Sequence, residues 1–187
     1  ISGEIHMGVH SMKDMPSTPA KGLVFTKVWK REDPRDVLIL RTAKHLSELR
    51  EDAVIATGSK RRAFQLLKLR PDLQIINIRG NVDTRLRKME EQQLDGIVLA
   101  AAGLKRLGME DVITQYLAPE DMISAPAQGA LALEVREDQK ELQKMLDVFC
   151  DEETMNEVCA ERNFLEQMGG SCHTPAGARC QKTDQGY

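Results

Sequence analysis

Short apolar runs alternate with longer segments of helical spacing along the middle of the chain. Apolar runs of strand length cover residues 53–56, 73–78 and 96–101. The first two lead into segments whose apolar residues recur every three or four positions, which predicts helices through Leu69 and Gln93. Strands that alternate with helices are typical of βαβ units. We therefore expect a mostly parallel sheet with helices on both of its faces.

Further strands are predicted on both sides of this region. Residues 4–10 alternate between apolar and polar side chains, which indicates a strand. Other strand-like runs cover 22–29, 36–40 and 130–135. The segment 30–36 is charged and contains Pro34, so we expect a hinge or a domain boundary there.

Two other segments have helical spacing. One is short and covers residues 44–50. The other covers 138–167, where we expect two helices that break near Asp151 and end at the glycines of positions 169 and 170.

The composition is that of an ordinary globular protein and argues against several classes of chain and function. The 187 residues include 26 Lys and Arg and 29 Asp and Glu, a formal net charge of −3, with 41% hydrophobic residues and 4% aromatic residues. This excludes collagen-like, low-complexity and wholly disordered chains. A slightly acidic chain is a poor general binder of nucleic acid, because phosphate contacts need surplus Lys and Arg. No apolar stretch is long enough for a membrane span, and no secretory leader is recognised. We therefore expect neither a membrane protein nor a secreted one.

The cysteines indicate a reducing compartment. Cys150, Cys159, Cys172 and Cys180 form no C-x-x-C pair and have no regular spacing. Cys172 follows two glycines and a serine, so its thiol is expected on an accessible loop, where it can act as a nucleophile or an attachment point. An unreactive loop cysteine explains the same pattern. Cys150 and Cys159 lie in helical, partly apolar surroundings and are predicted to be packing residues.

Two junctions between a strand and a helix combine small residues with arginines. Residues 57–62 read Thr-Gly-Ser-Lys-Arg-Arg, and residues 79–85 read Arg-Gly-Asn-Val-Asp-Thr-Arg. Unpaired N–H groups and the helix dipole favour anions at such a helix start. If the two strands are parallel neighbours, both junctions meet at one sheet edge, which suits a ligand with several carboxylates or phosphates. Solvated helix starts with surface arginines remain an alternative, and no Walker loop is present.

The end of the first predicted strand places two opposite charges side by side. Lys13 and Asp14 follow it directly, and a carboxylate at this point can stabilise a cation that forms on a substrate. A routine turn with two solvated side chains is the alternative. His6 and His10 are four residues apart, but a strand does not give them the geometry of a helical zinc motif, so no metal is expected.

Taken together, these motifs resemble porphobilinogen deaminase, also called hydroxymethylbilane synthase. The resemblance runs across nearly the whole chain, with the motifs in the right order. It rests on the stretches 10–16, 57–62, 79–85, 102–108, 126–129 and 169–175.

The resemblance implies a transferase of porphyrin and haem biosynthesis. It joins four porphobilinogen molecules head to tail, with loss of ammonia, into the linear tetrapyrrole hydroxymethylbilane. By this resemblance a dipyrromethane cofactor is attached to Cys172 through a thioether, and Asp14 matches the catalytic aspartate. The residues that match carboxylate ligands of cofactor and substrate are Lys13, Thr57, Ser59, Arg61, Arg62, Arg79, Arg85, Arg106 and Gln128.

This chemistry agrees with the pattern of charges. Each pyrrole carries an acetate and a propionate, so the growing chain is polyanionic and needs basic side chains around it. Loss of ammonia leaves a cationic carbon, and attack by the next pyrrole produces a second cation. A fixed carboxylate at Asp14 would stabilise both by preorganised electrostatics.

The implied fold is α/β, with two domains like type II periplasmic binding proteins joined by a hinge, and a small α+β domain at the C-terminal end. Domain 1 would comprise 1–29 and 130–147, domain 2 would comprise 35–123, and domain 3 would comprise 152–187 with Cys172. The resemblance also implies that the sequence is incomplete at both ends, which leaves domains 1 and 3 unfinished and this chain inactive alone.

The sequence departs from the family pattern at two positions, and two other functions compete with the one implied. Gly58 stands where the family often has a hydroxyl residue, and Ser171 stands where a second glycine usually precedes the cysteine. A non-catalytic polyanion-binding module explains the arginines but neither the Lys13–Asp14 pair nor Cys172. A nucleic-acid binder is disfavoured by the charge and by the few aromatic residues. We expect a cytoplasmic monomer that acts on porphobilinogen, without nucleic-acid or membrane partners.

Overall fold

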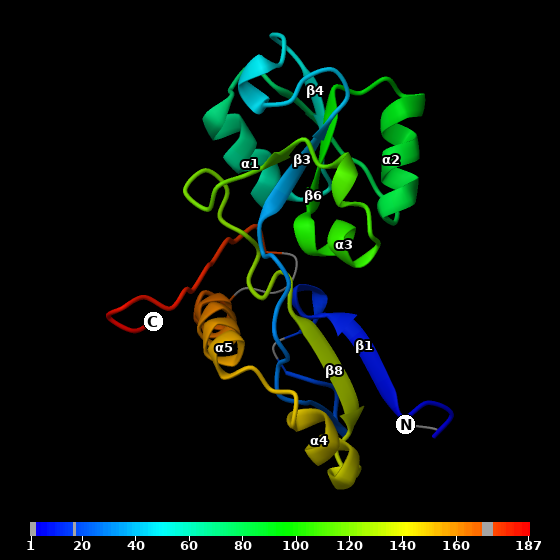
Figure 1. Ribbon diagram of the computed structural model, residues 1–187, viewed down its shortest axis with the longest axis vertical. Helices are drawn as coiled ribbons and strands as arrows, with labels where there is room; N and C mark the ends of the chain where they lie inside the picture. Colours follow the sequence, from blue (N-terminus) through cyan, green and yellow to red (C-terminus); the bar gives the residue numbers. More distant parts are fainter. Residues whose placement is uncertain (1–2, 17, 170–173) are drawn as a thin grey trace. The chain divides into compact units, whose positions relative to one another are not determined.

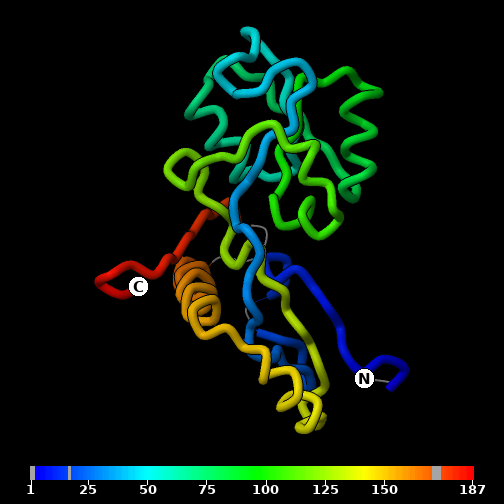
Figure 2. The backbone as a smooth tube through the Cα atoms, in the orientation of Figure 1, coloured from blue at the N-terminus to red at the C-terminus, as the bar shows by residue number. Residues whose placement is uncertain are grey.

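The computed structural model describes residues 3–16, 18–169 and 174–187 and divides the chain into two compact units. Unit 1 comprises residues 1–34 and 125–187, and unit 2 comprises residues 35–124. The chain therefore leaves unit 1 once and returns to it once, which can be followed along the tube in Figure 2. The expected division into three domains, with residues 152–187 as the third, stays a prediction.

Unit 2 is built on a five-stranded mixed sheet (Figure 1) with the order β5-β4-β6-β3-β7. The strands are β3 (Asp36–Leu40), β4 (Val54–Ala56), β5 (Gln74–Ile76), β6 (Gly96–Ala100) and β7 (Gln115–Tyr116). β4 pairs in parallel with β5 and β6, whereas β3 runs antiparallel to β6 and β7. The prediction of a mostly parallel sheet was therefore wrong for β3. Its continuous apolar run is buried on both faces in either direction, so the pattern could not fix the direction.

Three helices of unit 2 cover the two faces of this sheet: α1 (Lys60–Leu69), α2 (Val82–Glu91) and α3 (Ala101–Arg106). Leu38 of β3 and Val98 of β6 pack with Leu66 of α1 on one face. The intervening residues of the same strands belong to a second core with Met89 of α2 and Leu104 of α3. The predicted α/β class with helices on both faces is confirmed, as Figure 1 also shows.

The predicted helix at 44–50 is wrong in extent, because the structure has only the short 3-10 turn η2 (Leu46–Glu48) there. The Glu48 carboxylate accepts hydrogen bonds from the backbone N–H groups of Lys44 at 2.9 Å and His45 at 3.3 Å. These bonds cap a single turn, and they hold the pKa of Glu48 below its usual value. A second 3-10 turn, η3 (Glu110–Val112), lies before β7.

Unit 1 contains a three-stranded antiparallel sheet with the order β1-β8-β2. Its strands are β1 (Met7–Ser11), β2 (Leu23–Phe25) and β8 (Leu131–Arg136), and a 3-10 turn, η1 (Met12–Asp14), follows β1 directly. β2 is shorter than the strand-like run at 22–29. Two helices follow β8, α4 (Lys140–Asp147) and α5 (Glu152–Gln167), with Asp151 as the N-cap of α5. The predicted break near Asp151 is confirmed.

A tight loop leads into β8 and has unusual backbone geometry. Ala127 has φ of +60° and Gly129 has φ of +89°. A Cβ atom at Gly129 would overlap the carbonyl oxygen of Glu32, so this position requires glycine. The loop is packed into a core with Met12, Val28 and Val158.

Candidate functional site

The basic junctions of unit 2 lie at one edge of its sheet. β4 is parallel to both β5 and β6, so the loops that follow these three strands leave from the same edge. Arg61 and Arg62 lie in the first turn of α1 after β4. Arg79 and Arg85 flank the start of α2 after β5, and Arg106 ends α3 after β6. The expectation that both junctions share a sheet edge is confirmed.

Hydroxyl and amide side chains build the two helix starts. Ser59 is the N-cap of α1, and its Oγ accepts a hydrogen bond from the N–H of Arg62 at 3.4 Å. Thr57 Oγ1 accepts one from the N–H of Ser59 at 3.2 Å. Asn81 caps α2 by accepting from the N–H of Thr84 at 2.9 Å. Thr57 and Ser59 therefore shape the loop in addition to their predicted role as ligands.

Arg61 and Arg62 are buried and bind a carboxylate of the protein itself. Asp36, fully buried at the start of β3, accepts from Nη2 of Arg61 at 2.7 Å and from Nε of Arg62 at 2.9 Å. Arg62 Nη2 also lies 2.7 Å from the same carboxylate. Burial lowers the pKa of the Arg61 guanidinium. The role of Arg61 and Arg62 as ligands for carboxylates of cofactor and substrate stays a prediction.

Asp36 reaches this edge because β3 runs antiparallel to β6. Residue Asp36 pairs with Ala100, the last residue of β6, so the start of β3 lies where the parallel strands end. Sequence reasoning missed this acidic residue because the apolar pattern of residues 36–40 does not indicate the direction of the strand. A charged residue at the start of a wholly apolar strand was the available signal.

The other three arginines differ in exposure. The side chains of Arg79 and Arg106 are exposed, whereas Arg85 is half-buried. Arg85 Nε donates to the carbonyl oxygen of Gly80 at 2.8 Å, which fixes its guanidinium beside the start of α2. The edge thus presents positive charge next to two helix N-termini, an arrangement that favours carboxylates.

In unit 1 the structure brings Lys13 and Gln128 together. Lys13 Nζ donates to Oε1 of Gln128 across 3.2 Å, and Nε2 of the fully buried Gln128 donates to the carbonyl oxygen of Pro34 at 2.7 Å. Lys13 and Asp14 lie on η1, and Asp14 is exposed. A buried amide therefore binds the Lys13 ammonium group, and the carboxylate of the next residue, Asp14, is accessible.

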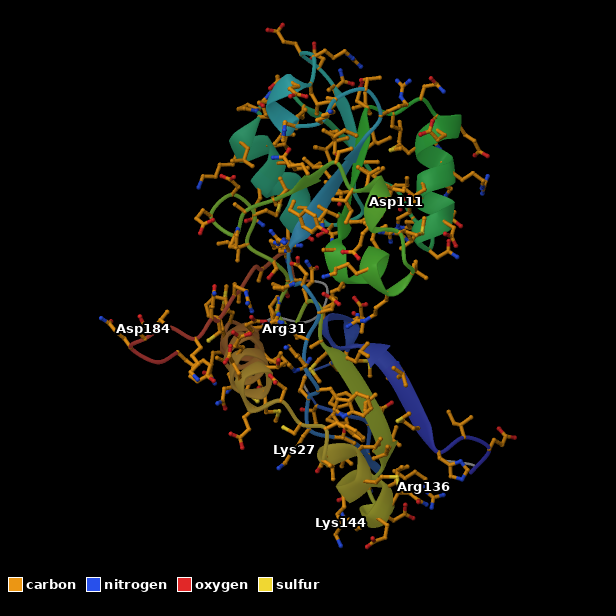
Figure 3. The ribbon with its side chains drawn as sticks, in the orientation of Figure 1. Lys27, Arg31, Asp111, Arg136, Lys144 and Asp184 are labelled. Atoms are coloured by element: carbon orange, nitrogen blue, oxygen red, sulfur yellow. The ribbon has the colours of Figure 1, made fainter. Side chains whose placement is uncertain are left out.

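A buried cluster of charges surrounds Gln128. Arg31, labelled in Figure 3, donates to the backbone oxygen of Gln128 at 2.7 Å and to the Glu161 carboxylate at 2.9 and 3.2 Å. Glu157 and Arg179 complete the cluster. Glu161 also accepts from the N–H of Ala127 at 2.7 Å, which holds the left-handed backbone there. Sequence reasoning missed these residues, although two glutamates four apart on one helix face were visible.

The cysteines are placed only in part. Cys172 lies outside the described residues. Cys150, Cys159 and Cys180 are free thiols. Cys159 is exposed, so its prediction as a packing residue was wrong: it lies on the solvent side of α5. Burial raises the pKa of the Cys180 thiol.

The described part of the chain has neither a metal-binding group of side chains nor a membrane-spanning helix. Among residues 3–16, 18–169 and 174–187, no three His, Cys, Asp or Glu side chains are grouped so that they could hold a metal ion. Within the same ranges, no helix is both long and apolar enough to cross a bilayer.

Residues 1–144 match the family model described as "Porphobilinogen deaminase, dipyromethane cofactor binding domain". This is more than half of the chain. The chain belongs to the porphobilinogen deaminase family. The matched region includes every site residue predicted in both units except Cys172.

Curated members of the porphobilinogen deaminase family are closely similar. The porphobilinogen deaminase of Lachnospira eligens is 57% identical over all of this chain and 64% of its own length. Those of Clostridioides difficile and Bacillus subtilis are each 52% identical, over 97% and 94% of this chain and 60% and 56% of their own lengths. The chain thus spans about three fifths of the relatives that it matches.

Solved structures with a similar backbone are more distant. A putative methionine-binding lipoprotein of Bacillus subtilis has a TM-score of 0.48 at 11% identity, over 72% of this chain and 64% of its own. The periplasmic VFT2 domain of Bordetella pertussis BvgS has a TM-score of 0.45 at 19% identity, over 78% of this chain and 61% of its own.

Proposed function

We propose that the whole protein of which this sequence forms part is a hydroxymethylbilane synthase. It polymerises four porphobilinogen molecules, with release of ammonia, into hydroxymethylbilane. The observation that carries this proposal is the match of residues 1–144 to the family's cofactor-binding domain. The sequence covers about three fifths of its relatives, so the activity is assigned to the intact protein.

The residues present fit a dipyrromethane cofactor attached to Cys172. Such a cofactor carries several carboxylates, and the groups proposed to bind them are Arg79, Arg106 and the N-terminus of α2 in unit 2, and Lys13 in unit 1. Guanidinium groups pair with carboxylates in a bidentate way. When bound through sulfur, the dipyrromethane supplies the primer to which pyrrole units are added.

Asp14 is proposed to stabilise the positive charge that develops on the substrate when ammonia leaves. Its carboxylate is exposed at the end of a turn whose first residue, Met12, is buried. A carboxylate fixed in advance needs little reorganisation during the reaction, which is the basis of electrostatic catalysis. Lys13, held by Gln128, would bind a carboxylate of the cofactor or substrate nearby.

The mass of the denatured intact protein tests the cofactor. We expect an excess equal to two pyrrole units, confined to the peptide that contains Cys172, with a colour reaction to Ehrlich's reagent. An unmodified Cys172 in protein that produces hydroxymethylbilane would contradict this attachment. An unmodified Cys172 in protein that binds polyanions without turnover would favour the non-catalytic module instead.

Replacement of Asp14 tests the catalytic role. Asp14→Asn is expected to retain the two-pyrrole mass excess but to lower turnover by at least about 100-fold, because the charge that opposes the developing cation is lost. Asp111→Asn is the matched control, since Asp111 is also an exposed aspartate on a 3-10 turn, η3 in unit 2 (Figure 3). Parental turnover in the Asp14 variant would contradict the catalytic role of Asp14.

A cytoplasmic location and a monomeric state belong to the same proposal. Three free cysteines among the described residues are compatible with a reducing compartment. Light scattering of the purified intact protein tests the monomer, and a mass of twice the chain would contradict it.

A further inference from the structure

A guanidinium group from α5 binds the backbone of the turn that carries Lys13 and Asp14. Arg162 Nη1 donates to the carbonyl oxygens of Met12 at 3.1 Å and Met15 at 3.4 Å. Arg162 Nη2 donates to the carbonyl oxygen of Pro16. Met12 and Met15 flank Lys13 and Asp14 in the sequence, so Arg162 contacts both ends of η1.

The N-terminal end of η1 is held by the core, and its C-terminal end is held by a side chain of α5. The N–H of Met12 donates to the carbonyl oxygen of Ala130 at 3.0 Å, and its side chain is buried beside Val28 and Val158. The turn is closed by the bond from the N–H of Met15 to the oxygen of Met12 at 3.1 Å. The chain then enters Pro16, which has no N–H with which to anchor itself. Arg162 holds this C-terminal end through the carbonyl oxygens.

Arg162 is itself held firmly. Its side chain is half-buried, and burial lowers the pKa of its guanidinium. A charge withdrawn from water is stabilised when its donors meet acceptors, which the three carbonyl oxygens provide. The guanidinium carbon also lies 6.0 Å from the centroid of the Phe25 ring on β2. A side chain restrained in this way on a helix can set the position of a backbone turn.

We propose that Arg162 is a positioning residue for Asp14. By binding carbonyl oxygens on both sides of η1, it holds the Asp14 carboxylate where positive charge develops on the substrate. This inference rests on the proposed function and extends it to the helix that precedes Cys172 in the sequence. A displacement of about 1 Å in a reacting group can lower a rate by roughly 100-fold.

The test compares three variants of the intact, cofactor-loaded protein. Arg162→Met keeps the aliphatic stem and removes every donor, and Arg162→Lys restores one charged donor group. Arg70→Met is the matched control, because Arg70 is also half-buried and donates to three carbonyl oxygens, those of Leu46, Leu49 and Arg50, away from the predicted site residues. Each variant is assayed for kcat, KM, two-pyrrole content, unfolding in urea and amide hydrogen exchange of residues 12–15.

Arg162→Met is expected to lower kcat by roughly 100-fold at unchanged KM and cofactor content, with faster amide exchange in residues 12–15. Arg162→Lys should recover part of the lost kcat and part of the slow exchange. Arg70→Met should change only the urea midpoint. Parental kcat or parental exchange in folded Arg162→Met would overturn the proposal. If Arg162→Met does not fold, parental values of both in Arg162→Lys would overturn it. Failure of the proposed function is distinct, since the parent protein would then release no hydroxymethylbilane, while the exchange result would still report on Arg162.

Discussion

At the scale of single residues, the Asp36 carboxylate binds two arginines that were predicted as ligands. It is fully buried between Arg61 and Arg62, so this part of the basic edge carries one negative charge against two positive ones. Removing one partner of a buried ion group is strongly destabilising, because the remaining charges have no water to stabilise them. Asp36 therefore holds both guanidinium groups in fixed positions.

Asp36→Asn is expected to lower the free energy of unfolding by about 3–5 kcal/mol, because it leaves two buried guanidinium groups with a neutral partner. Equilibrium unfolding in urea measures the loss. Glu91→Gln is the control, since Glu91 pairs with Arg87 on the exposed surface of α2 and its loss should change stability by only about 0.3 kcal/mol. Equal effects of the two substitutions would contradict the role of Asp36.

Residue types near the site could be predicted, but their partners could not. Two of the predicted site residues, Lys13 and Gln128, are in direct contact in the structure, but the motifs did not predict that contact. Asp36 and Arg162 were missed because each meets its partners across many positions of sequence, which no local pattern records. The N-caps Ser59 and Asn81 were within reach, because small polar residues before a helix have a local cause.

At the scale of elements, α5 supplies side chains that bind several other segments of unit 1. Glu157 and Glu161 bind Arg31, and Arg162 binds the exit of η1, all from one helix. The start of this helix is set by Asp151, whose carboxylate accepts from the N–H of Thr154 at 2.8 Å. That bond from the Thr154 backbone holds the pKa of Asp151 below its usual value.

The Asp151 cap gives a prediction with a defined pH dependence. Asp151→Ala should cost about 1 kcal/mol of stability near pH 7. Because the folded pKa is the lower one, the cap stabilises above the unfolded pKa of about 4 and is lost as the pH falls through the folded pKa. The difference between parent and Asp151→Ala in urea should therefore shrink below about pH 4.

Asp151→Asn is the matched variant, since asparagine caps helices without a titrating group. It should remain close to the parent at pH 7 and lose less stability on acidification. A constant difference between Asp151→Ala and the parent from pH 7 to pH 3 would contradict the assigned cause.

The kinds of element were easier to predict than their directions. Helices α1 and α2 and the break before α5 followed from spacing and caps, because these signals are local. The direction of β3 and the short turn at η2 depended on pairing with β6 and on the Glu48 carboxylate. Strand pairing is a tertiary contact, which no local pattern records, whereas the Glu48 bonds to residues 44 and 45 are local.

At the scale of the whole molecule, the two units differ in continuity. Unit 2 is one uninterrupted segment, residues 35–124, with core residues on both faces of its own sheet. Unit 1 is assembled from residues 1–34 and 125–187. A contiguous segment with its own core can in principle fold alone.

An isolated 35–124 segment is therefore expected to unfold in one cooperative urea transition and to have circular dichroism of a mixed α/β protein. Asp36→Asn should destabilise it by about the same 3–5 kcal/mol as in the intact protein. A broad, non-cooperative transition would show that the segment needs unit 1.

The position of β8 has a consequence for synthesis on the ribosome. Both β1 and β2 pair with β8, which begins only at Leu131, after all of residues 35–124. At a translation speed of roughly 5–20 residues per second, the two early strands wait several seconds for their shared neighbour to emerge. Nascent β1 and β2 are thus exposed to chaperones while the later-made segment already has every strand that it needs.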